Sequence, residues 1–275
     1  MSEPLPSLLL IGCGQMGGAL LDAWMEKGLA PSVIVDRHRN SLPAPHRVVR
    51  SLAEIPADFT PAAIILAVKP QKAMPVIEEL AARRPDLASV SVFVSVMAGL
   101  TTASMADAVR KNVPAASPAM VRAMPNTPSA IGRGMTGLYA APDVNDAQKS
   151  LCNTLLSSVG ATVWVDEEDQ INAVTAISGS GPAYVFLFAE LLEEAGVKLG
   201  LPQDVARLLA RKTTSGAGEL LDHSSEDAAV LRHNVTSPGG TTAAALAVLR
   251  APENWPSDIL EAVTAAFKRA RELAS

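Results

Sequence analysis

Short apolar runs alternate with helical stretches along the first 165 residues. The predicted strands are the near-continuous apolar runs Leu8–Ile11, Val33–Val35, Ala62–Val68, Val90–Val96 and Met120–Met124. Runs without polar alternation are typical of parallel strands that helices cover on both faces. After the first run, Ala19–Lys27 has the apolar spacing of a helix, and Gly28 closes it. The pattern predicts an α/β domain with a doubly wound parallel sheet.

The alternation ends with a predicted helix over Asn145–Ser158 and a strand over Ala161–Val165. Beyond Asp166 the spacing is helical, with predicted helices at Ile171–Ala176, Pro182–Ala195, Gln203–Leu221, Ala228–Arg232, Thr242–Arg250 and Ser257–Ala274. We therefore expect two domains, residues 1–165 and residues 166–275.

The predicted helix that begins at Pro182 is apolar around most of its circumference. Such a helix is buried on several sides. A helical domain of about a hundred residues has little core of its own to offer, so we expect this helix to pack in a partner chain. Burial against the first domain is the alternative.

Composition narrows the class of protein. The 275 residues carry a formal net charge of −5 and are 48% hydrophobic, which predicts a folded protein without a basic nucleic-acid or membrane-binding face. Cys13 and Cys152 lie far apart without neighbouring ligands, so we expect no metal site and no disulfide framework. No export signal and no apolar stretch of about 20 residues is evident, and we expect a soluble cytoplasmic protein.

A glycine-rich turn follows the first strand and opens the first helix. It consists of Gly12, Cys13, Gly14, Gln15, Met16 and Gly17. The G-x-G-x-x-G spacing allows a tight turn, close approach of the backbone to a pyrophosphate, and packing of helix on strand. With the next strand, Val33–Val35, it completes a βαβ unit, which favours a dinucleotide site over a mere connecting turn.

The residues after the second strand give conflicting signals about the dinucleotide. Asp36 favours NAD, because an acidic side chain at this position can bind the ribose 2′-hydroxyl. Arg37 and Arg39 favour NADP, because arginine can bind a 2′-phosphate. The arginines weigh the prediction toward NADP and leave NAD open.

Three further turns stand at the carboxyl ends of predicted strands, where open α/β sheets bind ligands. The first contains Ala67, Val68, Lys69 and Pro70, the second Ala98 and Gly99, and the third Asn126. Lys69 can reach a ribose or phosphate, and the Asn126 amide can bind a nicotinamide or a water. Together they favour a cofactor-binding edge over ordinary turns.

The most unusual segment of the second half is Asn234-Val-Thr-Ser-Pro-Gly-Gly-Thr-Thr-Ala243. Thr241 or Thr242 can cap the helix that follows. The N–H groups of Gly239, Gly240 and Thr241 can seat a carboxylate. A cap alone needs one hydroxyl, so the several hydroxyls of this loop favour anion binding over a cap without a ligand.

Motifs for acyl transfer or zinc hydrolysis are not evident in the second half, which argues against those reactions. A dehydrogenase acting on an alcohol normally needs a base for the hydroxyl proton. Reduction of an imine needs less, because the C=N nitrogen can arrive protonated.

These features resemble the pyrroline-5-carboxylate reductase family, and the matching motifs run in order along nearly the whole chain. They are Ile11-Gly-Cys-Gly-Gln-Met-Gly17, Ala67-Val-Lys-Pro70, Arg122-Ala-Met-Pro-Asn-Thr-Pro128, Ser178-Gly-Ser-Gly-Pro-Ala-Tyr184, Gly196-Val-Lys-Leu-Gly-Leu-Pro202 and Val235-Thr-Ser-Pro-Gly-Gly-Thr-Thr242. The last is the family's signature loop.

The resemblance implies an N-terminal Rossmann-type doubly wound parallel sheet and a C-terminal all-helical dimerisation domain that interleaves with a second subunit. It implies reduction of a cyclic imine carboxylate to L-proline with NADPH, NADH being possible. Residues 12–17, 67–70 and 98–99 would bind the cofactor, and Asn234 would reach it from the helical domain. Ser237, Gly239, Gly240 and Thr241 would hold the substrate carboxylate, and Thr242 would donate to the imine nitrogen.

Two other functions stay open at this point. One is another two-domain NAD(P)-dependent imine or 2-hydroxyacid oxidoreductase, for which the Pro182–Leu192 helix offers only Glu190 as a proton-transfer group. The other is a dinucleotide-binding sensor without catalytic activity, which would have no reason to keep the Ser237–Thr242 loop.

Overall fold

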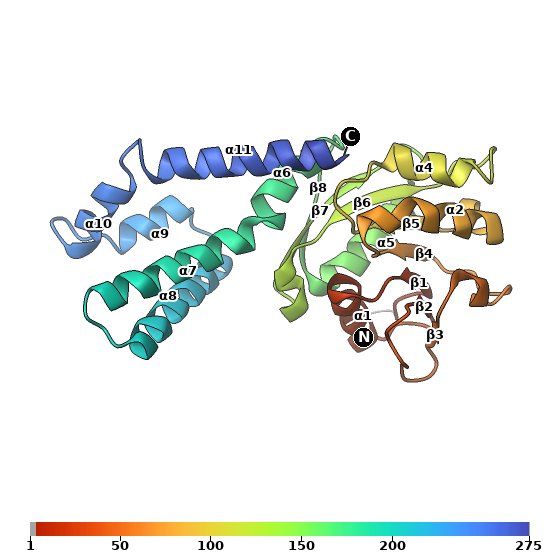
Figure 1. Ribbon diagram of the computed structural model, residues 1–275, viewed down its shortest axis with the longest axis horizontal. Helices are drawn as coiled ribbons and strands as arrows, with labels where there is room; N and C mark the ends of the chain where they lie inside the picture. Colours follow the sequence, from red (N-terminus) through yellow and green to blue (C-terminus); the bar gives the residue numbers. More distant parts are fainter. Residues whose placement is uncertain (1–3, 275) are drawn as a thin grey trace. The chain divides into compact units, whose positions relative to one another are not determined.

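The computed structural model describes residues 4–274, so residues 1–3 and 275 at the ends of the two predicted domains lie outside the described residues. The chain forms two compact units (Figure 1). Residues 1–179 together with 266–275 form one, here called the sheet unit, and residues 180–265 form the other, the helical unit.

One sheet of eight strands runs through the sheet unit in the order β3-β2-β1-β4-β5-β6-β7-β8. The strands are β1 Leu8–Ile11, β2 Val33–Val35, β3 Arg47–Val49, β4 Ala63–Leu66, β5 Val92–Ser95, β6 Met120–Met124, β7 Gly134–Ala140 and β8 Gly160–Trp164. All neighbours pair in parallel except β6 and β7. The first six strands have the order typical of a dinucleotide-binding doubly wound fold, which confirms the predicted fold class.

Helices cover both faces of this sheet (Figure 1). They are α1 Gln15–Glu26, α2 Ala73–Arg83, α3 Leu87–Val90, α4 Thr102–Arg110, α5 Asp146–Leu156 and α6 Gln170–Val174. Alternate strand residues point to opposite faces. Leu8 and Leu10 therefore join the core under α1 and α5, while Leu9 and Ile11 join the core under α2 and α4.

Two strands escape the sequence pattern. β3 has three residues and an exposed arginine at its start, so it carries little hydrophobic signal. β7 contains two glycines, which are unfavourable inside strands. The structure explains both, because a Cβ on Gly134 would collide with the Ser129 hydroxyl and a Cβ on Gly137 would lie 2.5 Å from a methyl carbon of Val174 in α6.

The compact units divide after Gly179, whereas the sequence pattern places the boundary after Val165. The cause is α6, which packs on the sheet and belongs to the sheet unit. Asn172 of α6 is buried and its amide oxygen lies 3.4 Å from a guanidinium nitrogen of Arg122 in β6. The alternation of strands and helices stops near residue 165, but the packing against the sheet continues beyond it.

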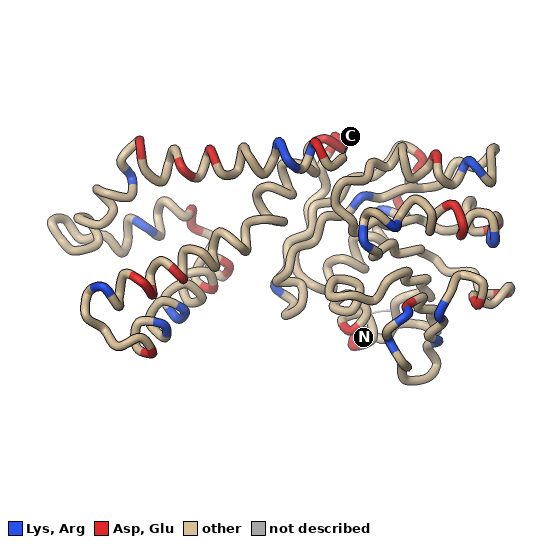
Figure 2. Tube along the Cα trace, in the orientation of Figure 1, with Lys and Arg blue, Asp and Glu red and all other residues tan. Residues whose placement is uncertain are grey.

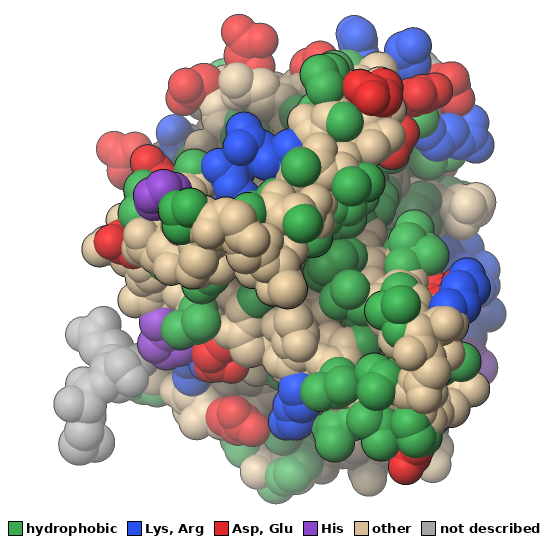
Figure 3. Space-filling model, turned by 90° about the vertical axis from the view of Figure 1, so that its left-hand side faces the viewer, with side chains coloured by type: hydrophobic (Ala, Val, Ile, Leu, Met, Phe, Trp, Pro, Cys, Tyr) green, Lys and Arg blue, Asp and Glu red, His purple; other side chains and the backbone are tan. Residues whose placement is uncertain are grey.

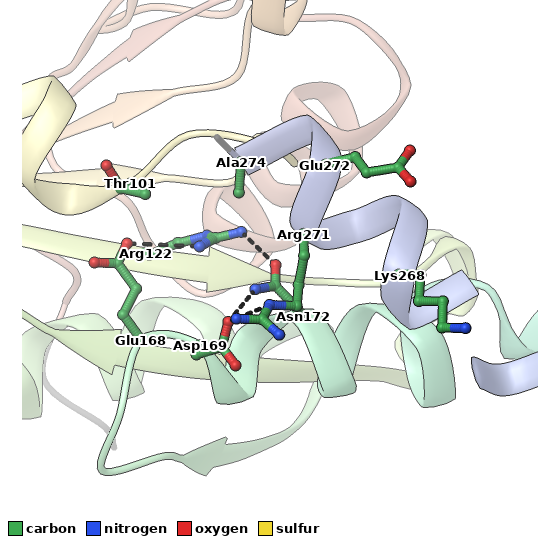
Figure 4. A pocket seen from close by; sticks show the side chains of 9 residues that line it. All are labelled: Thr101, Arg122, Glu168, Asp169, Asn172, Lys268, Arg271, Glu272 and Ala274. Atoms are coloured by element: carbon green, nitrogen blue, oxygen red, sulfur yellow. Dashed lines mark hydrogen bonds and ion pairs between the residues drawn. The ribbon is translucent and has the colours of Figure 1, made fainter. Parts of the chain in front are cut away.

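Arg122 is the centre of a buried polar cluster (Figure 4). Its side chain is 2% exposed and lies 3.5 Å from the carboxylate of Glu168. Glu168 also accepts hydrogen bonds from the backbone N–H and the hydroxyl of Thr102 at the start of α4. Burial lowers the pKa of Arg122, and Glu168 opposes that shift. The cluster ties β6, α4 and the segment before α6 together.

The helical unit consists of α7 Gly181–Lys198, α8 Gln203–His223, α9 Ala228–Asn234, α10 Thr241–Leu249 and most of α11, which runs over Trp255–Ala274 and returns to the sheet unit. Many large hydrophobic side chains of this unit are exposed, among them Phe186, Leu187, Leu208, Leu220 and Leu260. Figure 3, which faces this part of the molecule, shows hydrophobic side chains spread over the surface, with charged side chains between and around them.

Within the part of the chain that the structure describes, the helical stretch Gln170–Lys198 is long and apolar enough to cross a membrane by length and composition. The sequence pattern predicts no such stretch, because Gly179, Gly181 and Pro182 interrupt it. The helix nevertheless continues, since a π-helical turn over Thr175–Gly179 leads from α6 toward α7 and Pro182 lies in the first turn of α7.

Glu168→Ala tests the buried cluster. The variant leaves the Arg122 charge buried without its carboxylate partner, which is expected to lower the free energy of unfolding by about 3 kcal/mol or more. Chemical denaturation measures the loss. Glu167→Ala is the matched control, because this neighbouring side chain is exposed, and its unfolding free energy should match the wild type. Equal stability of the two variants would contradict the structural role of the cluster.

Candidate functional site

The three glycines of the β1–α1 turn have three different surroundings. Gly12 has a positive φ of 93°, and a Cβ there would lie 2.6 Å from the carbonyl oxygen of Ala67. A Cβ on Gly17 would collide with the carbonyl oxygen of Gly12. A Cβ on Gly14 would meet nothing within 4 Å. Gly12 and Gly17 thus allow the backbone to pack, while Gly14 faces open space.

The amino end of α1 lies in this open space. Gly14 is its N-cap, and no side chain caps it. The first N–H groups of a helix lack intrahelical partners and carry the positive end of the helix dipole. The turn therefore has a backbone surface and free donors that fit a pyrophosphate.

Asp36, which directly follows β2, binds the same turn. One carboxylate oxygen accepts the N–H of Cys13 at 2.7 Å, and the other accepts the N–H groups of His38 and Arg39 at 2.7 and 2.9 Å. Partial burial raises the pKa of Asp36, but these three donors outweigh it and hold the pKa below its ordinary value. The carboxylate is thus engaged inside the protein.

Three arginines surround this loop, and two of them are bound within it. Arg39 donates to the Cys13 sulfur at 3.3 Å and to Asp22 at 3.2 Å. Arg50, which follows β3, donates to the carbonyl oxygens of Arg39 and Asp36. Arg37 is exposed and makes no hydrogen bond or ion pair with any described residue. The sequence pattern missed Arg50, because its strand is too short to be recognised.

The other predicted cofactor segments also stand at the carboxyl edge of the sheet. Residues 67–70 follow β4, and Lys69 is exposed before a short 3₁₀ turn over Pro70–Lys72. Ala98 and Gly99 follow β5. Gly99 has a positive φ of 75°, and a Cβ there would lie 2.7 Å from the carbonyl oxygen of Leu273. The end of α11 therefore packs on the turn after β5.

The side chain of Asn126 makes internal hydrogen bonds that the sequence pattern does not reveal. Its amide nitrogen donates to the carbonyl oxygen of Ser178 at 3.0 Å, and its oxygen accepts the N–H of Met135 at 2.9 Å. The amide therefore joins the end of β6 to β7 and to the π-helical turn. Its role toward a cofactor stays a prediction.

The signature loop of the helical unit offers free polar groups. α10 begins at Thr241 with Gly240 as its N-cap and no side-chain cap, so the expectation that Thr241 or Thr242 caps it is wrong. The hydroxyls of Ser237, Thr241 and Thr242 make no hydrogen bond within the described part of the chain. Gly239 has a positive φ of 69°, and the N–H of Gly240 donates to the Ser237 carbonyl.

This loop and α10 carry no charged side chain from Val235 to Leu249 (Figure 2). An anion bound here would interact with N–H groups and hydroxyls instead of a cationic side chain. Asn234, at the end of α9, has its amide nitrogen 3.3 Å from the carboxylate of Glu226. The structure thus places the predicted substrate residues in one loop of the helical unit and most predicted cofactor residues at one edge of the sheet unit.

Gly14→Ala separates binding from folding. A methyl group on Gly14 meets no protein atom and the residue has a negative φ of −74°, so thermal stability should stay within about 0.5 kcal/mol of wild type. A dinucleotide lying against this turn would be displaced, and its affinity should fall at least tenfold in a fluorescence titration. Gly12→Ala is the control that should also lose stability, because its methyl group collides with Ala67. Unchanged affinity in Gly14→Ala would remove the pyrophosphate from this turn.

Asn126→Ala removes the link to the π-helical turn. The Ser178 carbonyl and the Met135 N–H lose their partner. Because these groups are only partly buried, the expected cost is about 1 kcal/mol, the lower end of the range for an unpaired group. Thermal unfolding should reveal this loss without any ligand present. A variant as stable as wild type would show that water replaces the amide.

Comparison with known proteins gives the family. A family model described as "Pyrroline-5-carboxylate reductase dimerisation" matches residues 168–273, and one described as "NADP oxidoreductase coenzyme F420-dependent" matches residues 7–99. A pyrroline-5-carboxylate reductase of Pseudomonas aeruginosa is 38% identical over 280 residues, covering 98% of this chain and 97% of the relative. One of Synechocystis is 38% identical over 272 residues, covering 96% of this chain and 97% of the relative.

Solved structures agree. A pyrroline-5-carboxylate reductase of Coxiella burnetii has a TM-score of 0.86 at 34% identity and covers 98% of both chains. A pyrroline carboxylate reductase of Plasmodium falciparum, with NADP bound, has a TM-score of 0.80 at 28% identity and covers 100% of both chains. Sequence and fold are thus similar over the full length, and the chain belongs to the pyrroline-5-carboxylate reductase family.

Proposed function

We propose that this protein reduces L-1-pyrroline-5-carboxylate to L-proline with NADPH, the last step of proline biosynthesis. The observation that carries the proposal is the full-length similarity to several pyrroline-5-carboxylate reductases. The uncapped N-terminus of α1 at Gly14 and the uncapped N-terminus of α10 at Thr241 support it, because they offer anion seats for a cofactor and a carboxylate.

NADPH, when bound, supplies the hydride. The N–H groups after Gly14 would hold its pyrophosphate, and residues 67–70 with Ala98 and Gly99 would line its course along the carboxyl edge of the sheet. Arg37 would bind the 2′-phosphate, because its guanidinium has no partner among the described residues. The NADP bound in the Plasmodium structure and the match to an NADP oxidoreductase model support this cofactor. NADH is the second cofactor to test as a hydride donor.

The substrate carboxylate would lie on the N–H groups of Gly239, Gly240 and Thr241, with the Ser237 hydroxyl as a further donor. The uncapped start of α10 and the unbonded hydroxyls support this seat. The Thr242 hydroxyl would lie beside the imine nitrogen and donate to the lone pair that develops on this nitrogen as the hydride adds to the carbon. Asn234 would contact the cofactor. Fixing the carboxylate at one end orients the ring, so that the imine carbon meets the hydride in one geometry.

The reaction balances with one hydride and one proton. The hydride adds to the imine carbon, the C=N π electrons move to nitrogen, and nitrogen bears the proton with which the protonated imine arrives. A strong base is not needed, which agrees with a loop of hydroxyls and N–H groups. Positioning and hydrogen bonding to the nitrogen are the contributions that we assign to the protein.

The exposed apolar side chains of the helical unit support a homodimer formed through this unit, or a higher assembly of such dimers. The family model that matches residues 168–273 is described by dimerisation. A partner chain would also cover the apolar stretch Gln170–Lys198, which explains its composition without a membrane. We place the protein in the cytoplasm and assign no nucleic-acid partner.

The direct test is oxidation of NADPH and NADH by purified protein with pyrroline-5-carboxylate, followed by absorbance of the reduced nicotinamide, with a reaction lacking the imine as control. We expect imine-dependent oxidation, and at the same low concentration of either cofactor we expect NADPH to be oxidised faster than NADH. Cofactor binding without oxidation would contradict the proposal and favour a sensor. Oxidation with a 2-oxoacid instead would favour a 2-hydroxyacid oxidoreductase.

Thr242→Val removes the proposed donor to the imine nitrogen. Loss of one hydrogen bond that strengthens in the transition state is expected to lower kcat about 10²- to 10³-fold. Thr241→Val is the matched control, because it keeps the backbone N–H and should change KM more than kcat. Steady-state kinetics at saturating NADPH distinguish the two. An unchanged kcat in Thr242→Val would remove the role assigned to this hydroxyl.

A further inference from the structure

The carboxylate of Asp36, directly after β2, is almost fully occupied by hydrogen bonds within the protein. An ionised carboxylate has about four acceptor directions. Three of them are filled in this protein, by the N–H groups of Cys13, His38 and Arg39. Little acceptor capacity is left for the pair of hydroxyls on a ribose, which is what an acidic residue here binds in NAD-dependent folds.

The three donors come from two segments with different tasks. Cys13 lies in the glycine turn, where the pyrophosphate would bind, and His38 and Arg39 lie in the loop after β2. Asp36 therefore fastens the glycine turn to the arginine loop by charge-assisted hydrogen bonds at 2.7–2.9 Å. A shift of one segment would pull on the other.

The remaining contacts of the loop tighten the same arrangement. Arg39 is held by Asp22 and by the Cys13 sulfur, and Arg50 is held by the carbonyl oxygens of Arg39 and Asp36. Two of the three guanidinium groups thus support the loop. Arg37 lies between the fastened residues Asp36 and His38, and its exposed side chain is left for a ligand.

We propose that Asp36 is a positioning residue for recognition of the 2′-phosphate: it holds Arg37 beside the glycine turn and thereby favours NADPH, instead of binding the ribose 2′-hydroxyl of NADH. The inference rests on the proposed function, since it concerns the cofactor of that reaction. The lowered pKa of Asp36 agrees with it, because the ionised form is the better acceptor for three N–H groups.

Dissociation constants of NADPH and NADH test the proposal on the full chain without substrate. Arg37→Ala should weaken NADPH about 10- to 100-fold, as expected for a lost charged hydrogen bond, and leave NADH nearly unchanged. Asp36→Ala should weaken NADPH by a similar factor and NADH less, so that selectivity for NADPH falls. Asp36→Asn keeps one acceptor oxygen and should lie between Asp36→Ala and wild type.

Arg47→Ala is the matched control. Arg47 is an exposed arginine at the start of β3, paired with Val33 at the amino end of β2, and therefore lies at the opposite edge of the sheet from the carboxyl ends. Its loss should leave both dissociation constants unchanged. The double variant Asp36→Ala/Arg37→Ala tests whether Asp36 acts through Arg37, in which case the second substitution adds little further loss of selectivity.

The opposite outcomes overturn the proposal. If Asp36 binds the ribose, Asp36→Ala weakens NADH alone and NADPH binding is unchanged or improved. If Asp36 only stabilises the fold, both cofactors weaken by one factor, selectivity is kept, and the melting temperature falls without ligand. Imine-dependent oxidation by the wild type is measured separately, so failure of the positioning role leaves the proposed function standing, and failure of imine reduction is recognised as such.

Discussion

The carbonyl of Ala67 and the backbone of Gly12 stand so close that a side chain on Gly12 has no room. This contact fixes the start of the glycine turn against the end of β4, at the point where the central parallel strands finish together. Gly17 repeats the constraint in the first turn of α1, because a side chain there would collide with the carbonyl oxygen of Gly12. The amino end of α1 is thereby directed across the carboxyl edge of the sheet, and the turns after β2, β4 and β5 fall around it. The glycines make this packing possible and leave one of their number, Gly14, facing outward.

The sequence allowed the central part of this arrangement to be predicted, because its signals are local. The buried strands β1, β4, β5 and β6 are continuous apolar runs, and the glycine spacing lies between a strand and a helix. The side-chain hydrogen bonds were not predictable in the same way. The donors to Asp36 include a backbone N–H that lies 23 residues away, and Asn126 meets a carbonyl 52 residues away. Such partners are decided by the tertiary fold, and a motif position alone does not reveal them.

The boundary between the units shows the same limit. Hydrophobic periodicity records where strands stop alternating with helices, which happens near Val165. It does not record that α6 packs on the sheet, which depends on the missing side chain of Gly137 and on the polar cluster of Arg122, Glu168 and Asn172. The helical continuity through Thr175–Gly179 was hidden for a related reason. Glycine and proline signal an interruption, but a π-helical turn and a first-turn proline accommodate both.

The two anion seats proposed for this protein, one in each unit, differ in chemistry. The sheet unit adds a free guanidinium to its helix terminus, which suits a phosphate. The signature loop has no charged side chain from Val235 to Leu249. This suits a carboxylate bound beside a protonated imine, because a cationic side chain there would lower the pKa of that imine and favour loss of its proton. The most direct test is the fate of deuterium in NADPH that carries deuterium in place of both hydrogens on the reacting carbon of the nicotinamide. The account predicts proline that carries deuterium on the former imine carbon. Unlabelled proline, or no proline while the label remains in the cofactor, would contradict direct hydride transfer by this protein.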